Sequence, residues 1–250
     1  MNDSEIKVLV KDSYGKIAAR GVSCCPTKGS CCGTLPPEEI SKGIGYSEEE
    51  MNAVPQGANL GLGCGNPIAL ASIKEGETVL DLGSGAGFDS FLAAGRVGPT
   101  GKVIGVDMTP EMINRARENA AIGSYSNVQF RQGELEDLPV DDNSVDVIVS
   151  NCVINLVPDK KKAFEEAFRV LKPGGRLMVS DLVLHQELPD RIKESIEGYV
   201  GCISGAVMKD VYLDTIRSVG FGDVEVIEES AFNEFADSVS SIKVKAIKPR

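Results

Sequence analysis

The sequence predicts a doubly wound α/β fold built on a seven-stranded, mostly parallel sheet. From Glu77 onward, short apolar segments alternate with segments in which apolar residues recur at helical spacing, and such βα units pack as a parallel sheet with helices on both faces. Residues 145–150 are nearly all apolar, as expected for a central parallel strand. The chain has 250 residues, of which 42% are hydrophobic, so it is long enough to bury a substantial core.

Residues 1–65 are predicted to form an N-terminal extension ahead of the sheet. Within it, residues 5–20 are expected to be helical. Residues 21–45 carry four cysteines among glycines and prolines, and this composition predicts a loop. Ser47 is predicted to be an N-cap, because three glutamates follow it where the dipole of a helix favours acidic side chains.

Residues 66–181 are predicted to be the core of the domain. Pro67 is expected in the first turn of a short helix that reaches about Ile73, and Thr109 is expected to cap the helix after the second strand. Strands are expected at residues 78–80, 103–106, 128–130, 145–150 and 176–181, and helices at residues 87–96, 110–121 and 160–171.

Residues 182–250 depart from the regular alternation. The pattern predicts helices at 189–200 and 207–219 and two further strands at 221–227 and 241–247. The segment between Leu182 and Met208 does not fit a minimal βα unit. It is therefore interpreted as an insertion that covers the active site, while the last two strands complete the sheet.

The composition narrows the classes of function. A net charge of −11 repels a polyphosphate backbone and argues against a nucleic-acid substrate. The basic run at residues 160–162 is interpreted as a solvated helix start. No apolar run approaches the ~20 residues that cross a bilayer, and residues 1–11 lack a signal-peptide core, which predicts a cytoplasmic protein. His185, the only histidine, is expected to be an ordinary surface residue, so a multi-histidine metal site or a Ser/His/Asp hydrolase is hard to build.

A glycine-rich loop follows the first predicted strand and opens a helix. It reads Asp-Leu-Gly-Ser-Gly-Ala-Gly over residues 81–87. Asp107 ends the next strand, where an acid accepts hydrogen bonds from the ribose hydroxyls of a nucleotide. Dinucleotide-binding folds usually read Gly-x-Gly-x-x-Gly without an acid before the first glycine. The form with Asp81 instead resembles the S-adenosylmethionine-binding loop of class I methyltransferases.

Two further motifs match this family: residues 133–136 after the third strand, and the Lys-Pro-Gly-Gly turn at 172–175 before the fifth. The resemblance covers about residues 66–180 and implies a Rossmann-like methyltransferase fold with S-adenosylmethionine as cofactor. In the family, the acid of the loop helps to hold the methionine part of the cofactor, and the adenine lies after the third strand. The cofactor-binding positions implied by the matching motifs are Asp81, Gly83, Ser84, Gly85, Asp107, Met108, Leu135, Glu136 and Asn151.

Three of the seven cysteines lie at informative positions. Cys152 follows the predicted fourth strand, and in open α/β sheets ligands bind beyond the carboxyl ends of the strands. Cys64 and Cys202 lie in glycine-rich segments, as expected where backbone closes around a site. A free cysteine is often only a buried filler, but three such positions together favour a site. The odd number and irregular spacing of the cysteines argue against a secreted disulfide scaffold.

Four stretches together strongly resemble arsenite methyltransferases: residues 81–87, 105–109, 150–159 and 201–206. The resemblance implies that the thiolates of Cys64, Cys152 and Cys202 bind trivalent arsenic, a soft centre that prefers soft ligands. The arsenic lone pair would then attack the methyl group of S-adenosylmethionine, and catalysis would mainly position two bound reactants. The implied substrate is arsenite or one of its thiol conjugates.

The same resemblance implies a fourth catalytic cysteine with a redox role. Methylation oxidises arsenic to the pentavalent state, and thiols must reduce it before another methyl group is added. Cys32 is the best match, because it lies nearest to Cys64, and thioredoxin or glutathione is the expected reductant of the resulting disulfide. The family needs only one cysteine here, whereas this chain has two adjacent pairs, so the assignment stays open among Cys24, Cys25, Cys31 and Cys32. Structural zinc in this loop is disfavoured, because adjacent cysteines are poorly placed to bind one ion.

Two alternatives for the whole chain stay open. A methyltransferase of a small organic acceptor, such as a quinone or sterol precursor, would keep its activity when Cys64, Cys152 or Cys202 is replaced by serine. A non-catalytic metalloid-binding protein would bind arsenite without turnover. No nucleic-acid or membrane partner is expected, and nothing in the sequence demands more than a monomer.

Overall fold

The structure, a computed structural model, describes residues 2–20, 35–193, 195–232 and 237–250. The predictions made for Cys24, Cys25, Cys31 and Cys32 lie outside the described residues.

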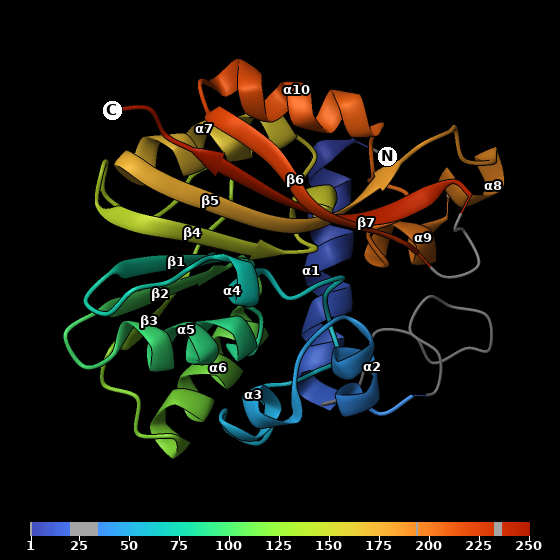
Figure 1. Ribbon diagram of the computed structural model, residues 1–250. Helices are drawn as coiled ribbons and strands as arrows, with labels where there is room; N and C mark the ends of the chain where they lie inside the picture. The colour runs from blue at the N-terminus through green and yellow to red at the C-terminus, as the bar shows by residue number, and fades with distance from the viewer. Residues whose placement is uncertain (1, 21–34, 194, 233–236) are drawn as a thin grey trace.

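A single seven-stranded sheet runs through the described part of the chain, in the order β3-β2-β1-β4-β5-β7-β6 (Figure 1). Strands β1 to β5 are parallel, and β7 is antiparallel to both of its neighbours. The predicted doubly wound, mostly parallel sheet is confirmed. The strands are β1 (Thr78–Leu82), β2 (Lys102–Asp107), β3 (Val128–Gln132), β4 (Val145–Asn151), β5 (Leu171–Leu184), β6 (Gly222–Ala231) and β7 (Val239–Ile247).

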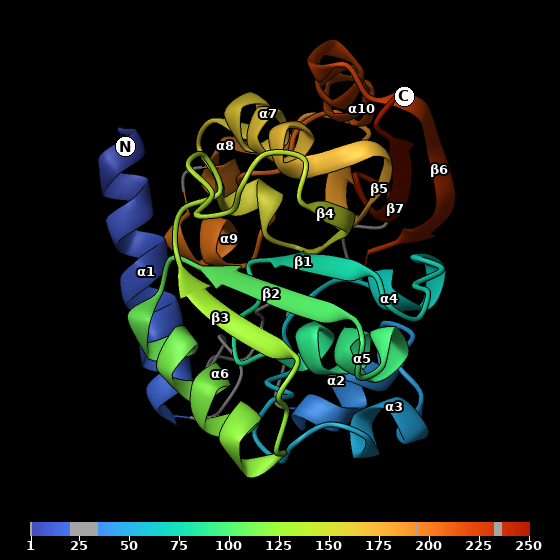
Figure 2. The same ribbon diagram turned by 90° about the vertical axis from the view of Figure 1, so that its left-hand side faces the viewer.

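Helices cover both faces of this sheet. Figures 1 and 2 show α4, α5 and α6 on one face and α7 and α10 on the other. Within the described ranges, no helix combines the length and apolarity needed to cross a membrane. The helices are α1 (Asp3–Arg20), α2 (Pro37–Gly43), α3 (Glu48–Asn52), α4 (Pro67–Leu70), α5 (Phe88–Val97), α6 (Pro110–Ile122), the 3-10 turn η1 (Ile154–Leu156), α7 (Lys160–Val170), α8 (Asp190–Lys193), α9 (Ile196–Val200) and α10 (Lys209–Val219).

The two faces of the sheet build separate parts of the core. Successive strand residues point to opposite faces, so Leu80 packs with α7 and α10, while its neighbour Val79 packs with α4 and α5. Phe164 on α7 and Tyr212 on α10 meet edge to face, with 5.6 Å between ring centroids. Because both faces of the central strands are buried, these strands read as apolar runs rather than alternating ones.

Several elements differ from their sequence-based predictions in extent. The helix at Pro67 ends at Leu70 instead of about Ile73, and Ser72 follows with a positive φ of 48°. The predicted helix 189–200 is divided into α8 and α9. Strand β5 continues three residues beyond Asp181, because β7 pairs with it as far as Leu184.

The two predicted helix caps differ in outcome. Ser47 caps α3 through a complete capping box with Glu50. Thr109 precedes α6 as predicted, but its side chain makes no capping hydrogen bond. Asp107 accepts the Thr109 N–H instead, at 2.8 Å.

Helix α1 lies across the carboxyl edge of the sheet. In Figure 2 the arrows of β1, β2 and β3 all point toward it. It packs against α6, where Arg115 donates a hydrogen bond to the carbonyl of Ala18 at 2.6 Å. The N-terminal extension therefore covers the edge at which open α/β sheets bind their ligands.

Candidate active site

A cavity of about 810 Å³ lies at the carboxyl edge of the sheet, beneath α1. Its walls contain the nine predicted cofactor residues and the three predicted arsenic ligands. The structure thus brings together every predicted site residue that it describes. Pockets of this size bury a drug-sized ligand, so cofactor and acceptor would share one enclosure.

The glycine-rich loop turns sharply between β1 and α5. Gly83, Gly85 and Gly87 all have positive φ, at 68°, 51° and 98°, which is the region that favours glycine. At Gly83 a side chain would also collide, because an added Cβ would lie 2.4 Å from Cγ2 of Val153. The loop therefore requires glycine for backbone shape and for its contact with the segment after β4.

Asp107 organises the loop through its carboxylate. It accepts the backbone N–H of Gly85 at 3.0 Å and that of Thr109 at 2.8 Å. Burial raises the pKa of Asp107 above its ordinary value, while these hydrogen bonds oppose the rise. The carboxylate lines the cavity and is fixed in place by backbone before any ligand is bound.

A buried network of acids lies beneath the same part of the cavity. Asp81 accepts a hydrogen bond from Ser90 at 2.6 Å, and Asp89 accepts one from the Tyr46 hydroxyl at 2.6 Å. Burial, together with the charge of Asp89, raises the pKa of Asp81 well above its usual range. Burial also raises the pKa of Asp89 to about 6, against the hydrogen bonds from Tyr46 and Asn151. This end of the cavity favours a positively charged ligand.

Asn151 joins this acidic network to the first cysteine. Its side-chain oxygen accepts the N–H of Cys64 at 3.0 Å, and its amide nitrogen donates to the carbonyl of Gly65 at 2.8 Å. The same nitrogen lies 2.9 Å from the Tyr46 hydroxyl and 3.1 Å from Asp89. The last residue of β4 thus holds the Cys64 segment directly beside Cys152.

The three cysteines come from three separate parts of the chain. Cys64 precedes α4, Cys152 follows β4, and Cys202 follows α9. The Cys202 thiol donates to the carbonyl of Cys152 at 2.9 Å, and Ser241 of β7 donates to the carbonyl of Cys64 at 2.7 Å. All three cysteines are free thiols.

Two of these cysteines have unusual backbone conformations. The φ of Cys152 is 58° and that of Cys202 is 63°, a region in which side chains other than glycine are strained. Hydrogen bonds with the neighbouring thiols of Cys202 and Cys64, together with burial, raise the pKa of Cys152 well above its usual range. The Cys202 thiol also has a raised pKa: its hydrogen bond with Cys152 lowers it, but burial and the nearby Asp181 and Cys64 raise it. The surrounding fold enforces this close approach of the thiols.

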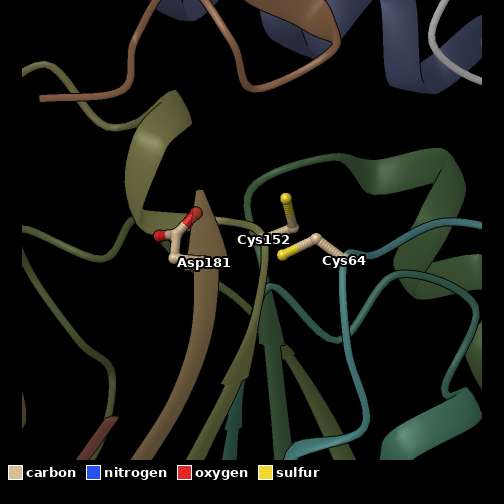
Figure 3. Close-up of side chains that lie close together, drawn as sticks. All are labelled: Cys64, Cys152 and Asp181. Atoms are coloured by element: carbon tan, nitrogen blue, oxygen red, sulfur yellow. The ribbon is translucent and has the colours of Figure 1, made fainter. Parts of the chain in front are cut away.

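Asp181 is a residue of the site that the sequence analysis did not single out. It lies on β5, one strand over from Cys152, and Figure 3 shows it near Cys64 and Cys152. Burial raises its pKa to about 7. The signal in the sequence was its position after the apolar part of the fifth predicted strand, at the edge where ligands bind.

Lys160 differs from its prediction as a solvated helix start. Its ammonium group donates to the carbonyl of Val157 at 3.1 Å and lies near Asp181 and Cys202. Burial lowers its pKa, while those two groups oppose the shift. The ammonium group of Lys160 therefore interacts with buried groups of the site. Lys161 and Lys162 are exposed, as predicted.

The opposite wall of the cavity is tied to α1. Lys7 forms ion pairs with Glu134 at 2.6 Å and with Glu136 at 3.0 Å. Tyr14 donates to the carbonyl of Val200, close to Cys202, at 3.1 Å. One helix thus contacts both the predicted adenine-binding segment and the segment of the third cysteine.

Residues of the cavity suit S-adenosylmethionine, which carries an ammonium and a sulfonium charge. Asp81 and Asp107 line the cavity at the ends of β1 and β2, and Glu136 lies after β3. Positive charge on a ligand stabilises such buried acids in their ionised forms. The donor set therefore fits this cofactor better than a dinucleotide, whose pyrophosphate is negative.

Comparisons with known proteins agree with this geometry. A sequence profile described as "Methyltransferase domain" matches residues 73–220. An arsenite methyltransferase of Halobacterium salinarum is 46% identical over 238 residues, which cover 92% of this chain and 61% of that relative. The crystal structure of an arsenic (III) S-adenosylmethionine methyltransferase from Chlamydomonas reinhardtii matches with a TM-score of 0.68 and 34% identity, covering 87% of this chain and 75% of that one.

A further match to a methyltransferase covers less of the chain. A ubiquinone/menaquinone biosynthesis C-methyltransferase of Salmonella newport is 42% identical over only 113 residues, 45% of each chain. This chain spans 61%, 63% and 59% of the length of the first three curated relatives. The fold, the cavity and these matches place the chain in the class of S-adenosylmethionine-dependent methyltransferases. Within that class, the chain belongs to the family of arsenite methyltransferases.

Proposed function

We propose that this chain transfers the methyl group of S-adenosylmethionine to trivalent arsenic. The observation that carries the proposal is the convergence of Cys64, Cys152 and Cys202 on the cavity that also contains the glycine-rich loop. A family member that methylates an oxygen, nitrogen or carbon acceptor has no need of three thiols at this place. Trivalent arsenic, which is soft and thiophilic, does need them.

The cofactor half of the cavity would be formed by eight of the nine residues named from sequence, all but Asn151. S-adenosylmethionine, when bound, supplies an electrophilic methyl group. Asp81 would face its methionine part, Asp107 would accept hydrogen bonds from its ribose, and Leu135 and Glu136 would contact its adenine. The side chain of Asn151 is already committed to the Cys64–Gly65 backbone. We therefore assign it the task of joining the two halves rather than a direct cofactor contact.

The thiol half would hold the substrate. Three cysteine thiols exchange with the three hydroxides of arsenite, forming three As–S bonds and releasing three waters, so no net proton appears. Arsenic then retains a lone pair, which is the nucleophile. Because nothing is deprotonated at arsenic during attack, the site needs no general base there, in keeping with a cavity whose described lining includes no histidine. Rate acceleration would come from positioning, worth ~7–11 kcal/mol in favourable cases.

The cycle also requires a reductant. Methyl transfer leaves pentavalent arsenic, which accepts two electrons from two thiols as these form a disulfide. We propose Cys32 as the N-terminal thiol of this step, with Cys24, Cys25 and Cys31 as the competing assignments, and thioredoxin or glutathione as the external dithiol or thiol that restores the enzyme.

A second candidate is methyl transfer to a small organic acceptor. It is favoured only by the 113-residue match to a quinone C-methyltransferase. The two candidates differ in what they require of the thiols, since an organic acceptor would not depend on Cys152.

A turnover assay tests the proposal. Reduced protein is incubated with arsenite, S-adenosylmethionine and a thioredoxin system, and arsenic species are separated by chromatography with elemental detection. Methylated arsenic from the wild type and none from Cys152→Ser is the expected result. Cofactor binding without any methylated arsenic would exclude arsenic as the acceptor, and full activity of Cys152→Ser would exclude the thiolate site.

A further inference from the structure

Asp181 converges with two of the cysteines on one point. The Sγ atoms of Cys64 and Cys152 and a carboxylate oxygen of Asp181 all lie within 4.8 Å of one another. Figure 3 shows the three side chains on neighbouring segments, with Asp181 on β5 and Cys152 just beyond β4. Nothing in the proposed arsenic chemistry uses this carboxylate.

The carboxylate of Asp181 forms hydrogen bonds but, among the described residues, no direct ion pair. Its two oxygens accept the N–H of Leu182 at 3.0 Å and the hydroxyl of Tyr212 at 3.2 Å. Within the described ranges, no lysine or arginine nitrogen lies within 4.0 Å of its carboxylate oxygens. Asp181 is fully buried, and buried carboxylates are usually paired with a cation or bound to a metal.

We propose that Cys64, Cys152 and Asp181 form a binding site for Zn²⁺, and that zinc bound there excludes arsenic. This inference is independent of the proposed methylation, because it concerns a different ligand and requires no turnover. It uses the same two thiols, so the two ligands compete.

The donor set distinguishes the two ligands. Zinc binds thiolates at about 2.3 Å and carboxylate oxygens at about 2.0–2.2 Å, so tetrahedral ligands lie about 3.5–3.8 Å apart. With all pairs within 4.8 Å, none has to close by more than about 1.3 Å, which side-chain rotation provides. Trivalent arsenic prefers three soft sulfurs. It would therefore recruit Cys202 and leave the carboxylate aside.

The balance of charge also fits a divalent cation. Two thiolates and one carboxylate carry three negative charges, so the zinc complex would retain one. The ammonium group of Lys160 interacts with Asp181 and Cys202 from the start of α7 and offsets that charge. The Cys202 thiol is engaged with the carbonyl of Cys152, which leaves the fourth zinc position to water.

The test measures zinc and arsenite affinities of the same set of variants. All are made in a background in which Cys24, Cys25, Cys31 and Cys32 are serine, so that only the three remaining thiols are titrated. Reduced protein without cofactor is titrated anaerobically with Zn²⁺ against a chromophoric chelator, and separately with arsenite. Near-ultraviolet circular dichroism and S-adenosylmethionine binding verify that each variant is folded.

The two variants Asp181→Asn and Cys202→Ser are expected to have opposite effects on the zinc and arsenite affinities. Asp181→Asn weakens zinc binding by about 30-fold or more and arsenite binding by less than about threefold, while Cys202→Ser does the reverse. Cys64→Ser weakens both. In the background protein, the apparent dissociation constant of arsenite rises linearly with the concentration of free Zn²⁺.

Three outcomes would overturn the zinc site: no zinc binding by the background protein, unchanged zinc affinity in Asp181→Asn, or equal loss in Cys202→Ser and Cys64→Ser. If Asp181→Asn does not fold, Co²⁺ replaces zinc in the background protein, and its thiolate-to-cobalt bands must report two thiolates rather than three. Zinc binding of this kind in a protein that fails to methylate arsenite would reject only the proposed function.

Discussion

The two halves of the cavity are built on opposite plans. At the ends of β1 and β2, Asp107 is held by backbone N–H groups and the glycines take conformations natural to them. In the thiol half, Cys152 after β4 and Cys202 after α9 take conformations that favour glycine, and Asp181 on β5 is buried without a direct ion pair to a described residue. The first half is a finished scaffold for a ligand of constant shape. The second half contains two cysteines with strained backbone and a buried carboxylate without an ion pair. Such features are tolerated at functional sites, where a bound ligand can supply the missing interactions.

The largest effect should come from breaking the scaffold half. In Gly83→Ala, an added Cβ meets Val153 and the backbone must keep φ at 68°, which costs about 2–4 kcal/mol of stability and abolishes cofactor binding. Gly85→Ala is the matched control: it has φ of 51° but only Met112 at 4.0 Å, so it should cost about 1 kcal/mol. Urea unfolding and calorimetric binding measure both, and equal losses would refute the role of the Val153 contact.

A second test titrates the acids beneath the scaffold. Because the folded state raises the pKa of Asp89 from 3.8 to about 6, the folded protein binds that proton more tightly. Its contribution to stability is therefore fully present below about pH 4 and is lost as pH rises through 6, by up to about 3 kcal/mol.

Other acids titrate in the same range, so the comparison is with Asp89→Asn. Chemical unfolding of the cofactor-free protein at pH 4 and at pH 7 should show a loss in the wild type that is smaller in the variant. Identical pH dependence of the two proteins would contradict the assignment to Asp89.

The third test separates the two halves at Asn151. Asn151→Ala removes the two hydrogen bonds to the Cys64–Gly65 backbone and should cost about 2 kcal/mol of stability. Arsenite affinity should fall more than S-adenosylmethionine affinity, because Cys64 loses its fixed position beside Cys152. Asn151→Asp retains the acceptor for Cys64, but its carboxylate would face Asp89 at 3.1 Å in the present geometry. Its loss of arsenite affinity should therefore grow above pH 6, where Asp89 ionises. A variant that loses only cofactor affinity would show that Asn151 belongs to the scaffold half alone.

The smallest effect concerns backbone strain in the thiol half. Cys152→Gly should be about 1 kcal/mol more stable than Cys152→Ala, because glycine accepts the φ of 58°. At Cys64, which is not among the described residues with positive φ, the order should be reversed, with alanine the more stable. Thermal unfolding of the four variants gives both differences, and the same order at both sites would remove the argument for strain.

Sequence reasoning was most successful for local features and least for long-range contacts. The glycine-rich loop and Asp107 were predictable, because the turn and its acid lie on consecutive βα units. The approach of Asp181 to Cys152 was not, since it depends on the register between β4 and β5, which pairs Asn151 with Ser180. Lys160 shows the same limit: its place in a basic run indicates a solvated cation, and only the tertiary fold directs it inward.

The two plans also differ in when they are completed during synthesis. The hydrogen bonds that fix Asp107 join it to Gly85 and Thr109, which are close to it in the chain. Cys64, in contrast, depends on Ser241 of β7, which follows every other strand of the sheet in the chain. A growing chain can therefore form its glycine-rich loop early, while Cys64 and Cys152 wait for β7 to leave the ribosome. In that interval the thiols are open to oxidation or to stray metals, so chaperones or a high thiol concentration should matter more for producing active protein than for producing folded cofactor-binding protein.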